Sequence, residues 1–263
     1  MDDAQIKEMV RARYGGIAEA ATGACCGPAT SCCGDAVPGT PEAKSRRMGY
    51  SEAELAAVPD GANLGLGCGN PQAIAAMKTG ETVIDLGSGA GFDCFLAAQQ
   101  VGPNGRVIGV DMTHEMLAKA RENAAKIGAA NVEFRLGELE HLPIADNTAD
   151  VLISNCVINL VPDKAQVFRE AFRVLKPGGR VAISDVVNIT PLSAELRADT
   201  ALLCGCVAGA ASIDRLAGWL GEAGFVDVEI TPNPASRELI ATWAPGRGIE
   251  DHVVSAMVEA RKA

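Results

Sequence analysis

The sequence lacks the features that mark several common classes of protein. It has no apolar run of the roughly 18 residues that a membrane span needs. Basic residues are few, 23 Lys and Arg against 33 Asp and Glu, so the formal net charge is −10. Because nucleic-acid binding needs a basic face for the phosphates, this charge argues against such a partner. The acidic N-terminal segment, M-D-D-A-Q-I-K-E-M-V, does not have the form of a secretory signal.

The cysteine content does not suit a disulfide scaffold either. The sequence has nine cysteines, an odd number, and several of them fall inside predicted helices and strands. Together with the absence of a secretory signal, this predicts reduced thiols in a cytoplasmic protein. Four of the nine form two vicinal pairs, Cys25-Cys26 and Cys32-Cys33, in a Gly- and Pro-rich segment over residues 23–41. These pairs lack the C-x2-C spacing of common zinc sites.

The 263 residues suffice for one large domain with additions or for two small ones. Residues 1–75 are predicted to hold a helix over 4–21, the Cys-rich loop and a short helix over 51–58. From residue 76 to 263 apolar strand patterns alternate with helical ones, beginning with T-V-I-D-L-G and the helix F-D-C-F-L-A-A-Q-Q-V. This alternation predicts an α/β fold with a mostly parallel sheet and helices on both of its faces.

A glycine-rich segment, D-L-G-S-G-A-G-F-D over residues 85–93, lies between a predicted strand and a predicted helix. Glycines at such a turn let the backbone approach a ligand closely. Asp111 ends the next strand about 20 residues later. At that position a carboxylate commonly accepts hydrogen bonds from the hydroxyl groups of a ribose. A tight turn with no ligand is the alternative, but the strand, the helix and the acid together favour a nucleoside.

The composition of this loop indicates which nucleoside it holds. Its spacing is G-x-G-x-G, and Asp85 stands two residues before the first glycine. A carboxylate there is poorly placed for the anionic pyrophosphate of NAD. It suits the sulfonium and ammonium groups of S-adenosylmethionine (SAM), which has no phosphate.

The motifs D-L-G-S-G-A-G, V-D-M-T, G-E-L-E-H-L-P, D-V-L-I-S-N and L-K-P-G-G-R resemble those of class I SAM-dependent methyltransferases. The resemblance implies a Rossmann-like, seven-stranded sheet whose last strand is antiparallel. It also implies that the cofactor is bound on its methionine side by Asp85, Gly87, Ser88, Gly89 and Gly91, at its ribose by Asp111, at its adenine by Met112, Glu138 and Leu139, and near its sulfonium or carboxylate by Asn155.

Three cysteines outside the paired segment bear on the methyl acceptor. Cys156 directly follows the strand D-V-L-I-S-N, at the sheet edge where ligands bind in α/β folds. The strand is not followed by the Pro-Pro-aromatic motif of base methyltransferases, which disfavours a nucleobase nitrogen as acceptor. Cys68 lies in N-L-G-L-G-C-G-N-P, and Cys206 in L-L-C-G-C-V-A-G-A, which is predicted to be a helix carrying Cys204 as well. Spacing alone does not tell whether the three meet, and buried cysteine is often core filler, as we expect for Cys94.

The three segments L-G-C-G-N-P, S-N-C-V-I-N-L and G-C-V-A-G-A closely resemble those of arsenite methyltransferases. The resemblance implies that Cys156 and Cys206 hold As(III), with Cys68 as a third thiol, and that a lid near residues 188–215 covers the substrate. It also implies a thiol reductant such as thioredoxin or glutathione, and a role in arsenic detoxification. As(III) is thiophilic. Its lone pair carries no proton, in keeping with a motif set that contains no evident His or Lys base.

Two other functions remain open from the sequence. A methyltransferase for a quinone-like carbon acceptor would tolerate serine at all three cysteines. A non-catalytic As(III)-binding thiol protein would not depend on SAM, and the glycine loop with Asp111 argues against it. For the paired cysteines the sequence allows two interpretations. They capture arsenite or relay electrons, or they belong to an incidental loop.

Overall fold

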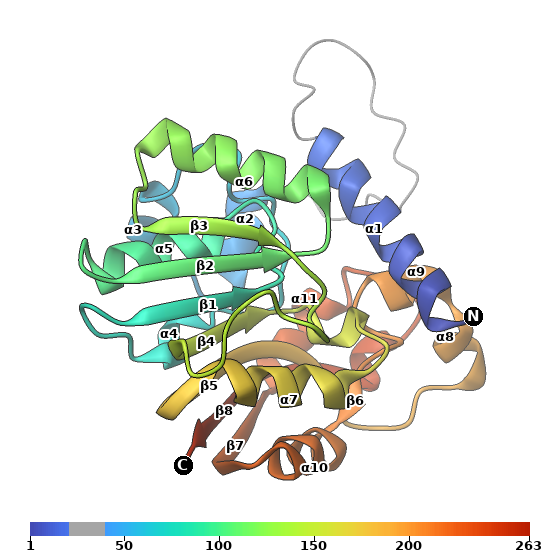
Figure 1. Ribbon diagram of the computed structural model, residues 1–263. Helices are drawn as coiled ribbons and strands as arrows, with labels where there is room; N and C mark the ends of the chain where they lie inside the picture. Colours follow the sequence, from blue (N-terminus) through green and yellow to red (C-terminus); the bar gives the residue numbers. More distant parts are fainter. Residues whose placement is uncertain (21–39) are drawn as a thin grey trace.

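The computed structural model describes residues 1–20 and 40–263 (Figure 1). Its strands form one sheet in the order β3-β2-β1-β4-β5-β8-β7, and the two-residue β6 pairs with the end of β5. Strands β1 to β5 are parallel, whereas β8 is antiparallel to both β5 and β7. The expected seven-stranded sheet with an antiparallel last strand is therefore confirmed, with β6 as a short addition. The strands are β1 (Thr82–Leu86), β2 (Arg106–Asp111), β3 (Val132–Leu136), β4 (Ala149–Asn155), β5 (Leu175–Asn188), β6 (Ala211–Ser212), β7 (Phe225–Asn233) and β8 (Val253–Lys262).

Helices cover both faces of the sheet, as the alternating pattern predicts (Figure 1). On one face α4 (Gln72–Ala75), α5 (Phe92–Val101) and α6 (His114–Ile127) pack on residues such as Val83. On the other, α7 (Lys164–Val174) and α10 (Ile213–Ala223) pack on residues such as Ile84. Because successive side chains of a strand point to opposite faces, β1 alone contributes to both cores.

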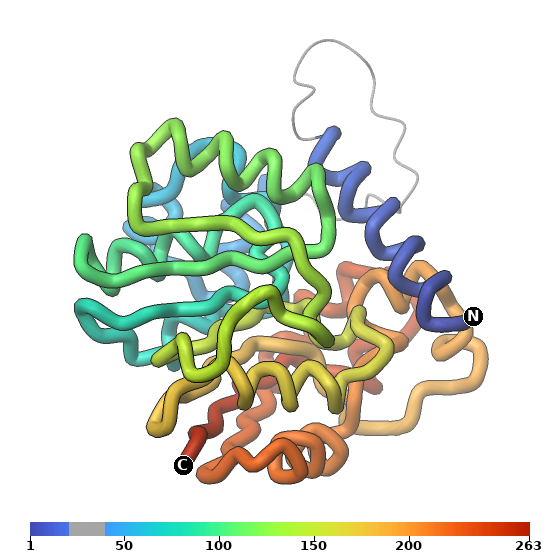
Figure 2. Tube along the Cα trace, viewed as in Figure 1, coloured from blue at the N-terminus to red at the C-terminus, as the bar shows by residue number. Residues whose placement is uncertain are grey.

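Helix α1 (Asp3–Ala20) lies across the carboxyl ends of the parallel strands, between α6 and α9 (Thr200–Cys204) (Figures 1 and 2). It passes close to α6, since a Cβ on Gly15 would lie 3.1 Å from Glu115 Oε2. At its other side the Tyr14 hydroxyl donates a hydrogen bond of 3.2 Å to the Cys204 carbonyl. The first helix predicted from the sequence thus becomes a cover over the strand ends.

The remaining short elements surround this edge of the sheet. One prediction about them is wrong: α9 ends at Cys204, and Cys206 lies beyond the helix with a φ of +64°. Cys204 and Cys206 therefore do not share a helix. The other short elements are α2 (Pro41–Arg47), α3 (Glu52–Ala56), α8 (Ala194–Ala198), α11 (Arg237–Ile240) and the 3-10 helices η1 (Ile158–Leu160), η2 (Pro234–Ser236) and η3 (Ile249–Asp251).

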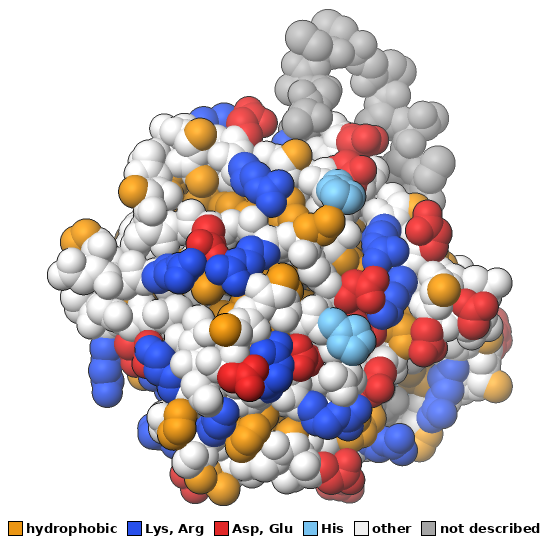
Figure 3. Space-filling model, viewed as in Figure 1, with side chains coloured by type: hydrophobic (Ala, Val, Ile, Leu, Met, Phe, Trp, Pro, Cys, Tyr) orange, Lys and Arg blue, Asp and Glu red, His pale blue; other side chains and the backbone are white. Residues whose placement is uncertain are grey.

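Two further expectations concern the surface and the paired cysteines. Within residues 1–20 and 40–263, no helix combines the length and the apolar character that crossing a membrane requires. Basic and acidic side chains are interspersed on the face in Figure 3, with no basic stripe of the kind that binds nucleic acid. The predictions for Cys25, Cys26, Cys32 and Cys33 lie outside the described residues.

Candidate functional site

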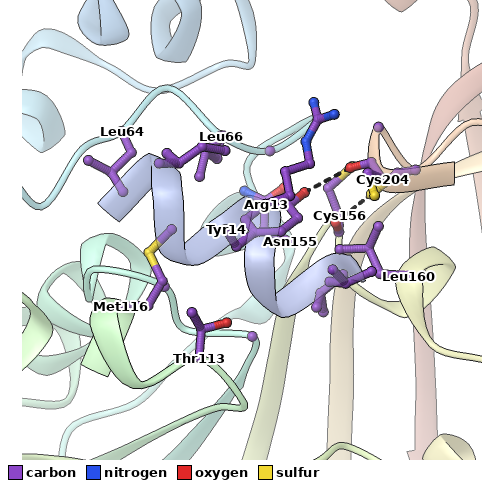
Figure 4. A pocket seen from close by; sticks show the side chains of 18 of the residues that line it. Arg13, Tyr14, Leu64, Leu66, Thr113, Met116, Asn155, Cys156, Leu160 and Cys204 are labelled. Carbon is purple, nitrogen blue, oxygen red and sulfur yellow. Dashed lines mark hydrogen bonds between the residues drawn. The ribbon is translucent and has the colours of Figure 1, made fainter. Parts of the chain in front are cut away.

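A cavity of about 770 Å³ lies at the carboxyl ends of β1, β2 and β4, beneath α1. One end is lined by the glycine loop and the other by Cys156 and Cys206. Figure 4 shows side chains from α1, the residue 64–66 segment and the end of β4 meeting around it. Because the two ends belong to one continuous space, a ligand at the loop and a ligand at the thiols would meet.

The glycine loop has the conformation that its composition predicts. Gly87, Gly89 and Gly91 have φ values of +72°, +50° and +94°, which residues other than glycine adopt only with strain. A Cβ on Gly87 would lie 2.6 Å from Val157 Cγ2, so the loop runs directly against the residue after Cys156. Gly87 and Gly89 line the cavity, whereas Gly91 is the residue before the first turn of α5.

Two buried polar groups of this loop and the next strand, Ser88 and Asp111, line the cavity. Ser88 lines the cavity, and within the described part of the chain its buried hydroxyl has no hydrogen-bond partner. Asp111 accepts hydrogen bonds from Gly89 N at 2.9 Å and from Thr113 N at 2.8 Å, so it fixes the loop and still faces the cavity. An unpaired hydroxyl and an ordered carboxylate at one wall are the features of a polar ligand site.

Three buried carboxyl groups, those of Asp85, Asp93 and Asp111, lie at this end of the cavity. Burial raises the pKa of Asp85 well above its usual value, and the neighbouring charge of Asp93 raises it further. Burial likewise raises the pKa of Asp93 and of Asp111. Cys94, confirmed as a buried residue, donates from its thiol to Asp85 Oδ2 at 3.2 Å. Among the described residues, no ion pair to a basic side chain is found for these acids. A cationic ligand would therefore stabilise their ionised forms and lower their pKa values.

Asn155 connects the two ends of the cavity. Its Nδ2 donates to the Gly69 carbonyl at 2.8 Å and to the Tyr50 hydroxyl at 3.0 Å. Tyr50 in turn donates to Asp93 at 2.7 Å, on the acidic side. On the other side, Asn155 Oδ1 accepts the backbone N–H of Cys68 at 3.1 Å. A single side chain thereby positions a carboxylate at one end and a thiol at the other.

The residues expected around an adenine divide into two groups. Met112 and Leu139 line the cavity. Glu138 is not among its lining residues, because its carboxylate turns to α1 and pairs with Lys7 at 2.7 Å and with Arg11. The hydrogen bond from Lys7 holds the pKa of Glu138 below its usual value. Glu138 thus secures the cover in this structure.

The three predicted thiols converge around Cys156. Ser184 on β5 anchors two of them: its carbonyl accepts the Cys156 N–H at 2.8 Å, and its hydroxyl lies 3.7 Å from Cys68 Sγ. The thiol of Cys206 donates to the Cys156 carbonyl at 2.9 Å. Cys68 and Cys206, which are distant in sequence, therefore both lie next to Cys156, which spacing alone does not show.

The surroundings of Cys156 favour the neutral form of its thiol. Hydrogen bonds with Cys206 and Cys68, followed by burial, raise the pKa of Cys156 well above the usual value of a thiol. Within the described residues none of the five cysteines forms a disulfide. A thiophilic ligand would have to displace the thiol protons on binding.

Two residues that the sequence analysis does not single out also belong to this site. Asp185 on β5 is buried, and one of its carboxylate oxygens lies within 4.8 Å of both Cys68 Sγ and Cys156 Sγ. The only signal for it is an acid inside the otherwise apolar run V-A-I-S-D-V-V. Tyr14 lies close enough for the charges of Cys206 and Cys156 to add to the effect of burial in raising its pKa. No sequence signal reveals Tyr14, because the position of α1 depends on tertiary packing.

Comparisons with known proteins agree with this geometry. A family model described as a methyltransferase domain matches residues 77–224. The chain is 56% identical over 268 residues to an arsenite methyltransferase of Halobacterium salinarum, covering 99% of this chain and 68% of that protein. It is 50% identical over 151 residues to an arsenite methyltransferase of Aquipseudomonas alcaligenes, covering 55% of this chain and 43% of that protein.

A solved structure is similar as well. The crystal structure of an arsenic(III) S-adenosylmethionine methyltransferase from Chlamydomonas reinhardtii aligns with a TM-score of 0.58 at 31% identity. The alignment covers 86% of this chain and 74% of that one. Several other solved structures with TM-scores near 0.6 are only 18–21% identical, and they support the fold alone.

Proposed function

Because the chain belongs to the arsenite methyltransferase family, we propose that it transfers a methyl group from SAM to As(III) held by cysteine thiolates. The observation that carries this proposal is the position of Cys156, which lines the cavity at the far end from the glycine loop. Cys68 lies beside its thiol, and Cys206 donates to its carbonyl. The biological role would be arsenic detoxification.

The residues at the loop end fit the cofactor. SAM supplies a methyl group on a sulfonium, and it carries an ammonium group and a ribose. Asp85 and Asp93 offer buried carboxyl groups whose ionised form the cationic groups would stabilise, and Asp111 offers a carboxylate for the ribose. The unpaired Ser88 hydroxyl gains a partner when a polar ligand is bound. Gly87 and Gly89 allow close approach, and Gly91 completes the turn of the loop into α5. Met112 and Leu139 supply apolar walls, and Asn155 fixes the boundary with the thiols.

At the thiol end, arsenous acid exchanges its hydroxyls for sulfur. Each thiol forms an S–As bond, and its proton leaves with one arsenic hydroxyl as water. With Cys68, Cys156 and Cys206 all bound, As(III) is neutral and keeps a lone pair opposite the three sulfurs. That lone pair is the nucleophile, so no general base has to remove a proton.

The contribution of the protein is therefore positioning and exclusion of water. Cys156 and Cys206 are held by backbone and carbonyl hydrogen bonds, and α1 covers the cavity with Val10 and Tyr14. Holding two reactants in a productive arrangement supplies about 7–11 kcal/mol in favourable cases.

Three further assignments follow the same proposal. Residues 76–263 form the catalytic domain, and residues 1–75 contribute the cover and Cys68. The segment near 188–215, which contains α8 and α9 and carries Cys206, is the substrate lid. A thiol reductant such as thioredoxin or glutathione keeps the cysteines reduced, which favours a cytoplasmic location.

The test is arsenic speciation by chromatography with element-specific detection. The purified chain is incubated with arsenite, SAM and a thiol reductant, beside Cys156→Ser and the control Cys204→Ser. Methylated arsenic from the wild type and Cys204→Ser, with a loss of at least about 100-fold in Cys156→Ser, is the expected result. Equal SAM affinity in all three, measured by calorimetry, assigns the loss to the thiol.

The opposite result is equally informative. If none of the three proteins methylates arsenite while all bind SAM, the arsenic acceptor is wrong, and a carbon acceptor such as a quinone becomes the better candidate. If Cys156→Ser is as active as the wild type, the thiol assignment fails even though the family assignment holds.

A further inference from the structure

The carboxylate of Asp185 has no task in the reaction proposed above, yet it is part of the thiol cluster. Cys68 Sγ, Cys156 Sγ and one Asp185 carboxylate oxygen all lie within 4.8 Å of one another. The thiol of Cys206 is not in this set, because it donates instead to the Cys156 carbonyl. The compact group in this conformation is thus two sulfurs and one oxygen, a different donor set from the three sulfurs that suit As(III).

This donor set is one that a divalent cation prefers. Zn²⁺ binds thiolate sulfur at about 2.3 Å and carboxylate oxygen at about 2.0–2.2 Å in a tetrahedron. Ligand atoms around such an ion lie roughly 3.5–3.8 Å apart, which follows from those bond lengths. The three atoms therefore need to close by only about 1 Å, which side-chain rotations can supply.

The surroundings of Asp185 orient it for this role. Its Oδ1 accepts hydrogen bonds from Asn159 Nδ2 at 2.9 Å and from Val186 N at 2.7 Å, and its Oδ2 accepts one from Ile158 N at 3.0 Å. The backbone of Asn159 also donates to this carboxylate. Fixed outer hydrogen bonds of this kind orient a metal-binding carboxylate.

The charge of the cluster and its access to solvent also suit a divalent cation. Two thiolates and one carboxylate carry three negative charges, so a complex with a divalent cation keeps one negative charge. Lys164 lines a small cavity beside Asp185 and can offset that charge. Cys68 and Asp185 are buried, whereas Cys156 is partly exposed and lines the main cavity, which leaves the fourth position open to water.

We propose that Cys68, Cys156 and Asp185 form a binding site for a thiophilic divalent cation, and that Zn²⁺ is the ion that fits it best. Binding releases the two thiol protons to the solvent, and a water molecule completes the tetrahedron. Because the site uses two of the thiols assigned to As(III), zinc and arsenite exclude each other. The cation site itself does not depend on methyl transfer.

The test uses Co²⁺ as a spectroscopic substitute for Zn²⁺. The full chain, reduced and free of metal, is titrated with Co²⁺ under anaerobic conditions without arsenite or SAM. The same titration is run on a variant in which Cys25, Cys26, Cys32 and Cys33 are serine, so that the paired thiols do not contribute. We expect one equivalent to bind, with thiolate-to-cobalt charge-transfer absorption and the visible bands of tetrahedral Co²⁺, and Zn²⁺ to abolish both.

Two substitutions in that variant decide between the possible ligands. Asp185→Asn keeps the shape and one acceptor oxygen but removes the charge, and it should weaken Co²⁺ binding by at least about ten-fold. Cys206→Ser should leave both the affinity and the charge-transfer intensity unchanged. Unchanged Co²⁺ affinity in Asp185→Asn, or a loss of one third of the charge-transfer intensity in Cys206→Ser, would overturn the proposal, since the ligands would then be three sulfurs.

A control separates loss of the site from loss of the fold. SAM affinity and the thermal unfolding of each variant are measured beside the titration. If Asp185→Asn does not fold, Cys68→Ser takes its place, because it leaves the hydrogen bonds of Asp185 intact. It should halve the charge-transfer intensity or abolish binding, and a spectrum identical to that of the parent would refute the site.

Discussion

Most of the cofactor end of the cavity is made by one short stretch of chain, with Leu139 added from after β3, whereas the thiol end draws on three separated segments. Residues 85–112 supply the glycine loop, Asp111 and Met112 through β1, α5 and β2. The thiols come from Cys68 before the sheet, Cys156 after β4 and Cys206 after α9. The first end is shaped by backbone conformation, and the second by side chains that tertiary packing brings together. The two ends should therefore fail in different ways when single residues are changed.

The largest expected effect is at the point where the ends touch. Gly87→Val places a side chain against Val157 at a φ of +72°, which combines backbone strain with overpacking. We expect a loss of about 2–6 kcal/mol in the free energy of unfolding, together with loss of both SAM and arsenite binding. Gly89→Ala is the matched control, because its nearest neighbour is Met116 Sδ at 3.9 Å, and it should cost only about 1 kcal/mol. Denaturant titration measures both, and equal losses would contradict the packing argument.

The next effect should be confined to the cofactor end. Asp111→Asn weakens the hydrogen bonds to Gly89 N and Thr113 N and removes the charged acceptor for the ribose. SAM affinity should fall by about 10- to 100-fold, the range for a hydrogen bond to a charged group. Arsenite binding, followed by quenching of tryptophan fluorescence or by mass spectrometry, should not change. A parallel loss of arsenite affinity would show that the two ends are not independent.

A smaller effect on both ends is expected for Asn155. Asn155→Ala leaves the Cys68 N–H without its acceptor and the Tyr50 hydroxyl without its donor. Unsatisfied buried groups cost about 1–3 kcal/mol, so stability should fall by that amount. SAM and arsenite affinities should each fall by a smaller factor than in the end-specific variants. Calorimetry with each ligand checks this, and an effect on one ligand alone would place Asn155 at one end only.

The smallest effect concerns the cover over both ends. The pKa of Glu138 is held below its usual value by Lys7 and Arg11, so its ion pairs stabilise α1 above about pH 4.5. That contribution is lost as the pH falls through the lowered pKa, when Glu138 takes up a proton. Lys7→Met should lower the free energy of unfolding by a few tenths of a kcal/mol at neutral pH. It should also reduce the decrease in stability that accompanies protonation of Glu138 at acidic pH. Hydrogen exchange in α1, measured as a function of pH, checks this. If the pH dependence is the same in Lys7→Met as in the wild type, apolar contacts alone hold the cover.

The contrast between the two ends also explains how much could be predicted. The alternating strands and helices, the glycine loop and Asp111 follow local rules of spacing, and the structure contains them within a few residues of their expected bounds. The prediction that Cys206 lies within a helix was wrong, because α9 ends at Cys204 and Cys206 itself has a left-handed backbone conformation. Gly205, the C-cap of α9, is the sequence signal for this end, since glycine commonly follows the last residue of a helix.

The residues that sequence reasoning missed depend on contacts across the fold. Tyr14 reaches Cys204 because α1 crosses the strand ends, and Asp185 reaches Cys156 because β5 is the neighbour of β4. Glu138 lies in the expected motif but turns toward Lys7 and Arg11, a direction that a motif does not specify. Position along a strand is local information, whereas the direction of a side chain is settled by what packs against it.

The backbone at the thiols has a consequence for engineering this chain toward higher temperatures. Among the described residues, five that are not glycine have a positive φ, and Cys156 and Cys206 are two of them. Replacing such residues by glycine is a usual way to gain about 1–2 kcal/mol, because it relieves left-handed strain. A selection for melting temperature alone would thus tend to delete both thiols, and heat resistance and activity would be selected in opposite directions at these two positions.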